Sequence, residues 1–318
     1  MITVVGEALV DLVHAAGAPS APTEHPGGSP ANVATALARL EVPVTLITQL
    51  GQDRLGRLVR EHLTAAGVRL HLTPGAANAT STAIATLDRS GGARYDFGIS
   101  WDLPAPPTLP GGSRCLHTGS IATGLDPGAG AVEELLARER DAGAVTLSLD
   151  PNVRPALLGS RDRARDRIER QIALADVVKV SEEDLAWLDP ARSPVDLARR
   201  WQRSGPALVV VTLGGGGSLA VTRSGTTFRP APPVTVTDTV GAGDAFTAGL
   251  LHWLDLAGLL GGDRRDALRA LGRGHACRML DAAARVAAFT CTRPGADPPT
   301  LRELRAFQPQ GQLATPEP

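Results

Sequence analysis

The residues best placed to do chemistry lie in one segment, residues 238–246, which reads Asp-Thr-Val-Gly-Ala-Gly-Asp-Ala-Phe. Valines alternate with polar residues before and into this segment, which predicts a half-buried strand, and apolar residues follow it at helical spacing. We therefore expect residues 241–244 to form a tight turn that leads into the first turn of a buried helix. Such a turn leaves backbone N–H groups unpaired at the positive end of the helix dipole, and this suits a bound phosphate.

Asp244 would lie beside that phosphate, where a carboxylate repels the ligand unless it has a separate task. The task that fits is to accept the proton of an attacking hydroxyl group. The backbone amides around it would form an anion hole for the charge that grows on the transferred group. These amides belong to Gly241, Ala242, Gly243 and Asp244 itself. On this turn alone, an ordinary strand–helix turn with an aspartate in the helix is an equally good interpretation.

A second motif near the other end of the chain favours the chemical interpretation. Residues 27–34 read Gly-Gly-Ser-Pro-Ala-Asn-Val-Ala and resemble the N-terminal signature of the ribokinase-like (PfkB-type) carbohydrate kinases. Residues 238–246 resemble the C-terminal signature of the same family. The two motifs occur in the family's order, and the resemblance extends from Val4 to about Pro299, which is nearly the whole chain.

The resemblance implies a reaction, its cofactors and a sugar site. The reaction is transfer of the γ-phosphoryl group of ATP to a sugar hydroxyl, with Mg²⁺ on the phosphates and Asp244 as the base. In the family, an aspartate after the first strand binds the sugar together with a glycine and an asparagine of the N-terminal motif. The matching residues here are Asp11, Gly28 and Asn32. A carboxylate such as that of Asp11 can accept hydrogen bonds from two neighbouring hydroxyls, although Asp11 taken alone is better interpreted as a turn residue.

A third segment bears on the identity of the sugar. Residues 150–154, Asp-Pro-Asn-Val-Arg, resemble a segment of fructokinases and 2-keto-3-deoxygluconate kinases. Arg154 could bind the carboxylate of an acidic sugar or the phosphates of ATP. The arginine that follows an aromatic pair in the kinases of acidic sugars is missing after Phe97, which favours fructose or a similar neutral sugar. Trp101 could either stack on the sugar or anchor a lid.

Two segments that follow predicted strands would bind ATP. The glycine-rich run at residues 212–217 resembles the segment that lines the family's nucleotide site, although a glycine hairpin is the simpler interpretation of the run alone. Ser181 and Asp184 replace the asparagine and glutamate with which relatives arrange magnesium through water, and a serine there is typical of fructokinases. Ser181 could also cap the following helix, and the two roles are compatible. The nucleotide-binding residues that we expect are Ser181, Thr212, Leu213, Gly214, Gly215, Gly216, Gly217 and Gly243.

A pair of loops resembles the monovalent-cation site of relatives, so K⁺ is a further candidate cofactor. The residues that match this site are Asp238, Val240, Arg293 and Gly295. The serine that usually completes the site is replaced around Pro299. None of the seven histidines pairs with another at ligand spacing, so we expect no protein-bound zinc.

The elements that must position these residues follow an α/β pattern. The expected strands lie near residues 114–118, 145–150, 177–180 and 207–213. Helices fill the gaps between them, which predicts a doubly wound, mostly parallel central sheet flanked by helices. Ligands bind at the carboxyl ends of strands in such sheets, and most of the candidate residues follow these ends. Two further helices are expected over residues 263–280 and 282–290.

A smaller sheet is expected beside the large one. Short alternating runs at about 7–14 and 68–102 predict a β-sheet lid, and residues 19–26 are expected to form a loop. The family uses this lid to cover the sugar and commonly to form a homodimer. The resemblance places lid and sheet in a single ribokinase-like domain over residues 1–318.

Composition argues against several other classes. The formal net charge of −1 argues against a nucleic-acid binder held by a basic field. No apolar run is long enough to span a membrane, and residues 1–7 lack the features of a signal peptide. Three cysteines match no zinc pattern, and we expect a cytoplasmic protein. Lys179 is the only lysine, and its context suits neither a Walker A motif nor a protein kinase.

Alternatives remain open within and outside the kinase interpretation. Within it, the substrate could be ribose, a nucleoside or 2-keto-3-deoxygluconate in place of fructose. Outside it, the chain could be a catalytically silent sugar- or nucleotide-binding protein of the same fold. A Rossmann dehydrogenase is disfavoured because no Gly-x-Gly-x-x-Gly motif follows the first predicted strand.

Overall fold

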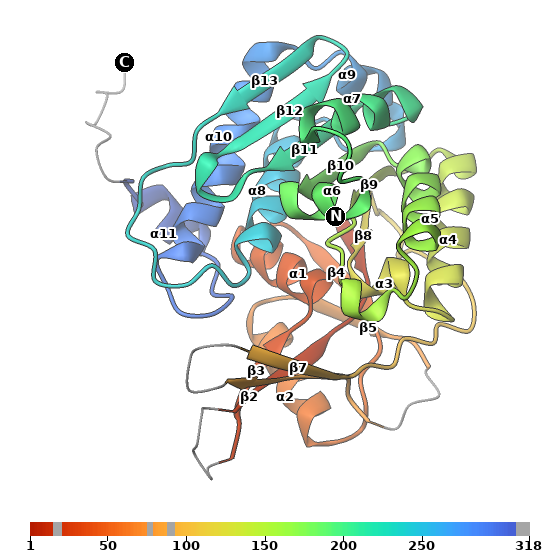
Figure 1. Cartoon of the computed structure of the whole chain (residues 1–318), viewed down its shortest axis with the longest axis vertical. Coiled ribbons are helices and arrows are strands. Elements are labelled where there is room, and N and C mark those ends of the chain that lie inside the picture. Colours follow the sequence, from red (N-terminus) through yellow and green to blue (C-terminus); the bar gives the residue numbers. More distant parts are fainter. Residues whose placement is uncertain (15–20, 75–78, 88–92, 310–318) are drawn as a thin grey trace.

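A computed structural model of the chain describes residues 1–14, 21–74, 79–87 and 93–309, and a sheet of nine strands forms its centre. The strands of this sheet are β1 (Ile2–Val5), β4 (Val44–Thr48), β5 (Arg69–Leu72), β8 (Cys115–Gly119), β9 (Thr146–Asp150), β10 (Val177–Ser181), β11 (Leu208–Thr212), β12 (Ser218–Thr222) and β13 (Gly225–Arg229). Their order is β13-β12-β11-β10-β9-β8-β1-β4-β5 (Figure 1). Neighbours from β5 to β11 are parallel, while β12 and β13 are antiparallel additions at one edge. The predicted mostly parallel sheet is confirmed.

Helices cover both faces of this sheet. They are α1 (Ser29–Arg39), α2 (Arg54–Ala65), α3 (Ile121–Gly124), α4 (Gly128–Ala142), α5 (Arg161–Leu174), α6 (Glu182–Leu188), α7 (Pro194–Ser204), α8 (Ala242–Leu256), α9 (Arg265–Arg269), α10 (Arg273–Cys291) and α11 (Leu301–Ala306). Helices α1, α2, α8 and α10 pack with Val4 and Val210 on one face, and α4 to α7 pack on the other with Val5 and Val211. Adjacent strand residues therefore point into two separate apolar layers, which is the doubly wound arrangement that the sequence predicts.

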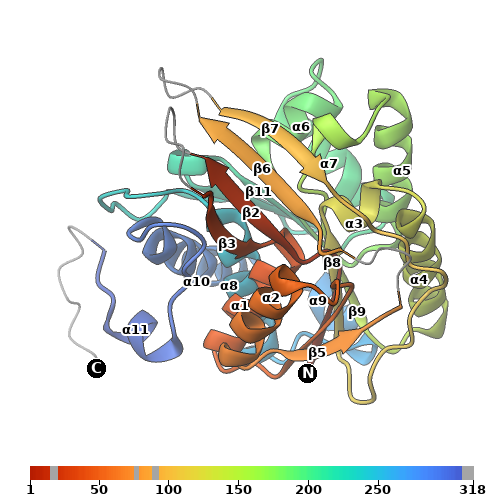
Figure 2. The same ribbon diagram turned by 90° about the horizontal axis from the view of Figure 1, so that it is seen from below.

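A second sheet of four strands lies below the large one in Figure 1 and faces the viewer in Figure 2. Its strands are β2 (Leu9–His14), β3 (Thr23–Gly27), β6 (Thr82–Leu87) and β7 (Ala93–Gly98), in the order β3-β2-β6-β7. A lid-like sheet was expected here, but two of its boundaries were wrong. The segment Arg69–Leu72 belongs to the large sheet, because α2 crosses over after β4 and returns the chain parallel to it. Residues 23–27, expected in a loop, form an edge strand, where Pro26 is tolerated.

Two other sequence expectations fail near the C-terminal motif. Residues 234–240 form no strand, and Val236 and Val240 are 57% and 54% exposed. The N–H groups of Thr237 and Asp238 donate to the carbonyl of Cys291, at the end of α10, at 2.8 and 3.3 Å, so they are not available to a sheet. Two helices were expected over 263–280 and 282–290. The helical structure is instead interrupted before Gly272, which separates the short helix α9 from α10, and α10 continues through residue 281 without interruption.

Among the described residues, no helix is both long and apolar enough to span a membrane.

Replacing Trp201 with alanine should destabilise the protein more than the same change at Trp187. Trp201 lies on α7, is 2% exposed and packs against the valines of β10 and β11, whereas Trp187 is only half-buried. Loss of the buried indole leaves a cavity, so we expect the free energy of unfolding to fall by about 3–5 kcal/mol. Urea unfolding monitored by circular dichroism measures both variants. Equal losses would contradict the role that we give to the α7 packing.

Candidate active site

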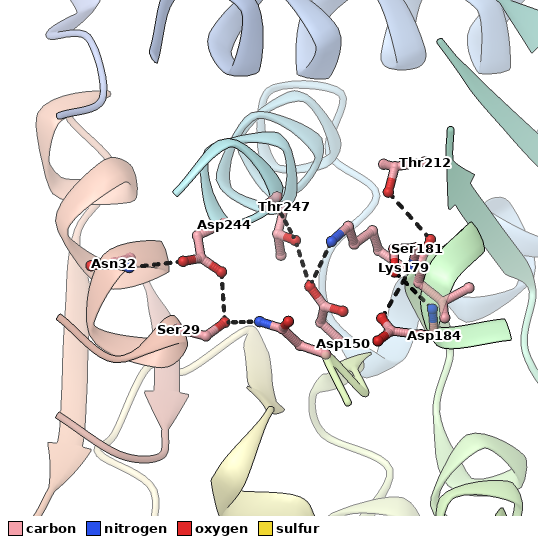
Figure 3. A network of polar contacts seen from close by, with 12 residues as sticks. Ser29, Asn32, Asp150, Lys179, Ser181, Asp184, Thr212, Asp244 and Thr247 are labelled. Carbon is pink, nitrogen blue, oxygen red and sulfur yellow. Dashed lines mark hydrogen bonds and ion pairs between the residues drawn. The ribbon is translucent and has the colours of Figure 1, made fainter. Parts of the chain in front are cut away.

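The candidate residues gather where the carboxyl ends of three strands meet the first turns of α1 and α8 (Figure 3). Asp150 ends β9, Ser181 ends β10 and Thr212 ends β11. Asn32 comes from α1 and Asp244 from α8. The structure brings these residues together, and the two glycine-containing motifs lie side by side although they are far apart in the chain.

The turn before α8 has the geometry that the sequence predicts. Gly241 precedes the helix with φ 75°, in the left-handed region, and a Cβ atom there would lie 2.6 Å from the Cβ atom of Ala296. Glycine is therefore required at this position. No side chain of the described residues caps α8, so the N–H groups of Gly243 and Asp244 have no intrahelical acceptor. The N–H group of Ala242 differs, because it donates to the carbonyl of Thr239 at 3.2 Å.

Asp244 is buried, and both oxygens of its carboxylate accept a hydrogen bond from α1. Ser29 Oγ donates to Oδ1 at 2.6 Å, and Asn32 Nδ2 donates to Oδ2 at 2.8 Å. Burial raises the pKa of Asp244, while these two hydrogen bonds and the charge of Lys179 oppose the rise. Each carboxylate oxygen keeps a second lone pair, so the group can still accept a proton from a hydroxyl placed against it.

Lys179 is a member of the site that sequence reasoning set aside. Its Nζ lies 3.0 Å from Oδ2 of Asp150, and both side chains are buried. A Cβ atom on Gly243 would lie 3.1 Å from this Nζ, so the ammonium lies directly against the turn of α8. Burial lowers the pKa of Lys179, but the charges of Asp150, Asp184 and Asp244 outweigh burial and raise it. The sequence did carry a sign that Lys179 is functional, because the only lysine of the chain lies in a predicted strand of valines.

Ser181 and Asp184 form a capping box at the start of α6. Ser181 Oγ accepts the N–H group of Asp184 at 3.0 Å, and Asp184 Oδ2 accepts the N–H group of Ser181 at 3.3 Å. Asp184 Oδ1 accepts the N–H group of Val153 at 2.9 Å. Burial raises the pKa of Asp184, and the charge of Asp150 adds to this rise. The helix-cap interpretation of Ser181 is confirmed.

The residues expected at the sugar come from β2 of the second sheet, the start of α1 and the loop after β9. Gly28 has φ 99°, and a Cβ atom there would lie 2.8 Å from the carbonyl oxygen of Glu7, so this motif glycine is also required. Asp11 lies on β2, where burial raises its pKa and the charges of His25 and Arg154 lower it. Arg154 Nη1 donates to Asn152 Oδ1 at 2.6 Å, a contact that the sequence did not suggest.

The glycine-rich run joins β11 to β12, which are antiparallel neighbours. Gly214–Gly216 form a turn of 3₁₀ helix, so the hairpin interpretation of the run is confirmed. A Cβ atom on Gly214 or Gly215 would meet nothing within 4 Å, so the outer side of the turn is open.

Trp101 has an anchoring role. It is 2% exposed, its Nε1 donates to the carbonyl of Ala122 at 3.1 Å, and Gly128 packs against the indole. A ring with so little exposed surface cannot stack on a ligand, so the alternative role of Trp101 at the sugar is wrong.

A hydrogen bond joins the two loops of the predicted cation site, one with Asp238 and Val240 and the other with Arg293 and Gly295. Asp238 Oδ2 accepts the N–H group of Gly295 at 2.7 Å, and Oδ1 accepts that of Val240 at 3.0 Å. Burial raises the pKa of Asp238, but these backbone hydrogen bonds outweigh it and leave the pKa lowered. The side chain of Arg293 is paired with Asp297 and Glu303. Within the described ranges, no group of three or more His, Cys, Asp or Glu residues could hold a metal ion.

Known proteins resemble this chain along most of its length. Residues 1–303 match the pfkB family of carbohydrate kinases. A fructokinase of Klebsiella pneumoniae is 38% identical over 265 residues, which cover 81% of this chain and 85% of that protein. The crystal structure of a fructokinase from Xylella fastidiosa with bound ATP has a TM-score of 0.82 at 28% identity and covers 96% of this chain and 97% of its own.

A second solved structure contains both a sugar and a nucleotide. It is a fructokinase double mutant from Vibrio cholerae O395 with fructose, ADP and a potassium ion, and its TM-score is 0.78 at 29% identity. The likeness covers 96% of this chain and 98% of that one.

A buried acid beneath the N-terminal motif makes stability depend on pH. Glu7 follows β1, its Oε2 accepts the N–H group of Ala122 at 3.0 Å, and its Oε1 has no hydrogen-bond partner among the described residues. Burial raises the pKa of Glu7 from 4.5 to about 7, against hydrogen bonds from its own backbone, Ser120 and Ala122 and the charge of Arg154. A raised pKa means that the folded protein holds a proton that the unfolded chain releases.

The stability that Glu7 contributes should be fully present below pH 4.5 and lost as the pH rises through about 7. Relative to a Glu7→Gln variant, the free energy of unfolding of the wild type should fall by about 3 kcal/mol across that interval. Urea unfolding at a series of pH values measures the difference, and Glu61→Gln, at an exposed site on α2, is the matched control. A difference between wild type and Glu7→Gln that stays constant with pH would contradict the prediction.

Proposed function

Because the chain belongs to the pfkB family of carbohydrate kinases, we propose that it is an ATP-dependent fructokinase, which transfers the γ-phosphoryl group of ATP to a hydroxyl of fructose. The observation that carries this proposal is the pair of hydrogen bonds from Ser29 and Asn32 to Asp244, because they join both family motifs around one buried carboxylate at a helix N-terminus. Fructokinases among the relatives, one of them with fructose and ADP bound, support the substrate.

Asp244 is the base in this proposal. It takes the proton of the attacking hydroxyl, while the amides of Gly241 and Gly243, with its own amide, stabilise charge on the transferred phosphoryl group. The amide of Ala242, expected among them from the sequence, is not counted because it donates to the carbonyl of Thr239. In a loose transition state the proton leaves late, so the position of the hydroxyl matters as much as basicity. The donors on both oxygens of Asp244 fix the direction in which its remaining lone pairs point.

Two cations complete the proposal. Mg²⁺ bound to the phosphates neutralises charge during transfer. Asp184 would hold it through water, and Oδ1 of Asp150 fits the same task because it is buried without a hydrogen-bond partner among the described residues. Carboxylate oxygens are the ligands that Mg²⁺ prefers. The loops joined by Asp238 are proposed as a K⁺ site, with backbone carbonyls supplied by Asp238, Val240, Arg293 and Gly295.

The remaining roles follow the family. Asp11, Gly28 and Asn32 would contact or enclose the sugar, whereas Arg154, whose Nη1 donates to Asn152, would act from behind these residues. The nucleotide would lie over the open glycine turn, against Ser181, Thr212, Leu213, Gly214, Gly215, Gly216, Gly217 and Gly243. We also propose one kinase domain over residues 1–318, a homodimer formed through the second sheet, and action in the cytoplasm, where ATP is supplied.

The variant Asp244→Asn should bind sugar and ATP within severalfold of the wild type but should lose turnover. An amide cannot accept the hydroxyl proton, and a general base contributes roughly 10²- to 10⁴-fold to the rate. Steady-state assays coupled to ADP release measure kcat and KM, with Asp141→Asn, at an exposed site on α4, as the matched control. A variant that kept a tenth of the wild-type kcat would remove Asp244 from the role of base and leave Asp238 as the next candidate.

Fructose should be phosphorylated with at least about tenfold higher kcat/KM than 2-keto-3-deoxygluconate, a gap of about 1.4 kcal/mol. Nη1 of Arg154 is engaged with Asn152 and Val153, and the second arginine expected after Phe97 is missing. The carboxylate of an acidic sugar would therefore find one partly engaged arginine, and a buried charge that is incompletely paired is costly. Fructose and 2-keto-3-deoxygluconate are assayed at the same concentrations of ATP and magnesium, and ribose and a nucleoside are assayed in the same way. The reverse order would contradict the fructokinase proposal, and binding without turnover of any substrate would favour a catalytically silent protein.

A further inference from the structure

A chain of hydrogen bonds connects Arg154 to the carboxylate of Asp244. Arg154 Nη1 donates to Asn152 Oδ1 at 2.6 Å, Asn152 Nδ2 donates to Ser29 Oγ at 2.8 Å, and Ser29 Oγ donates to Asp244 Oδ1 at 2.6 Å. The four residues come from the loop after β9, from α1 and from α8.

The direction of every bond in this chain is set by its first member. A guanidinium group can only donate, so the amide of Asn152 must turn its oxygen toward Arg154. The amide nitrogen of Asn152 then faces Ser29 and donates to it. A hydroxyl that accepts on that side has its own hydrogen free for the other side, where the carboxylate of Asp244 accepts it.

The backbone at Asn152 suits its place in the chain of hydrogen bonds. Asn152 has φ 37°, in the left-handed region, which asparagine adopts more readily than most residues with a side chain. Its side-chain amide accepts from Arg154 and donates to Ser29, and so passes the direction of donation from one to the other.

We propose that Arg154 and Asn152 are positioning residues, which fix the Ser29 hydroxyl as a donor to Asp244 and so keep this carboxylate ionised and oriented for proton transfer. The inference rests on the proposed function, in which Asp244 is the base. It gives Arg154 a role that needs no carboxylate on the substrate. The other groups that face Asp244 are Asn32 from α1, Lys179 from β10 and Asp150 from β9, and the test must separate their effects from that of the chain.

The test is a double-mutant cycle on the pH profile of kcat/KM with ATP and fructose. On the acidic side of this profile, kcat/KM falls as Asp244 becomes protonated, and we call this fall the acidic limb. Ser29→Ala removes the donor and should move the midpoint of the acidic limb up by about one pH unit, the size expected when a charged hydrogen bond is lost. Asn152→Asp replaces the amide that donates to Ser29 by a carboxylate, which only accepts. The Ser29 hydroxyl should then donate to residue 152 and no longer to Asp244. The shift that Asn152→Asp causes should be at least as large, in part because a negative charge is added.

The double variant separates direction from charge. In the Ser29→Ala background, Asn152→Asp can act only through its charge, so it should add less shift than it adds to the wild type. Additive shifts would overturn the proposal, since Asn152 would then act by charge alone. If Asn152→Asp does not fold, Asn152→Gly, which tolerates the backbone angle, takes its place. It must raise the midpoint of the acidic limb in the wild type and cause no further shift in the Ser29→Ala background.

Arg154→Met completes the cycle. It frees the amide of Asn152 to rotate and should raise the acidic limb less than Ser29→Ala does, without a rise in the KM for fructose. A raised KM with an unchanged pH profile would place Arg154 on the substrate and overturn its positioning role.

A further measurement keeps this inference distinct from the proposed function. If the wild type phosphorylates no sugar, the proposed function fails, and the protonation of Asp244 can still be followed by ¹³C NMR of its carboxyl carbon, assigned with Asp244→Asn. An NMR titration midpoint that rises in Ser29→Ala, and rises by less when Asn152→Asp is added in that background than in the wild type, supports the chain without any activity. Midpoints that do not move overturn it.

Discussion

A carboxylate buried inside a protein must find hydrogen-bond donors there, and the structure around Asp244 satisfies this constraint. An unpaired buried charge costs several kcal/mol, and the two oxygens of Asp244 take their donors from α1. The first turns of α1 and α8 are therefore held together, although the sequence separates them widely. Helix α8 is held on its other side by α10, where a Cβ atom on Gly249 would lie 2.9 Å from the backbone of Ala283. The position of the turn before α8 follows from these contacts.

The balance of charge is a second constraint on the site. The carboxylates of Asp150, Asp184 and Asp244 surround one ammonium, that of Lys179. With all four groups ionised, the three negative and one positive charges leave a formal net charge of −2. A polyphosphate brought into such a place without a cation would be repelled, which agrees with the divalent ion in the proposed function. The hydrogen bonds that these carboxylates accept from backbone and side chains disperse their charge, and the site is buried enough for each of them to matter.

The parts of the fold that the sequence predicted are those with strong periodicity. The parallel sheet, its two helical layers and the turn before α8 could be read from valine runs, helical spacing and glycines, since these patterns report burial and backbone shape directly. The edge strand β3 could not, because Pro22 and Pro26 are typical of a loop. The run that forms β5 was recognised as a strand, but its sheet was not, because a half-exposed edge strand has the same alternation whichever sheet it joins. The contacts of Ser29, Asn152 and Lys179 were also beyond reach, because each depends on side chains that tertiary structure brings together. For Lys179, its isolation in the composition was the one available signal.

The scarcity of lysine has a practical consequence for any chemistry performed on this protein. Its basic surface is built from arginine, and the one lysine is buried beneath the turn of α8, 3.0 Å from Asp150. A reagent directed at lysine side chains therefore has a single target within these residues, and that target lies inside the proposed site. Because Lys179 is buried and the nearby carboxylates raise its pKa, such a reagent would modify the folded protein slowly, and the rate of labelling would report how often this site opens. The same fact makes lysine coupling a poor way to attach the folded protein to a solid support, because the chain offers no exposed lysine.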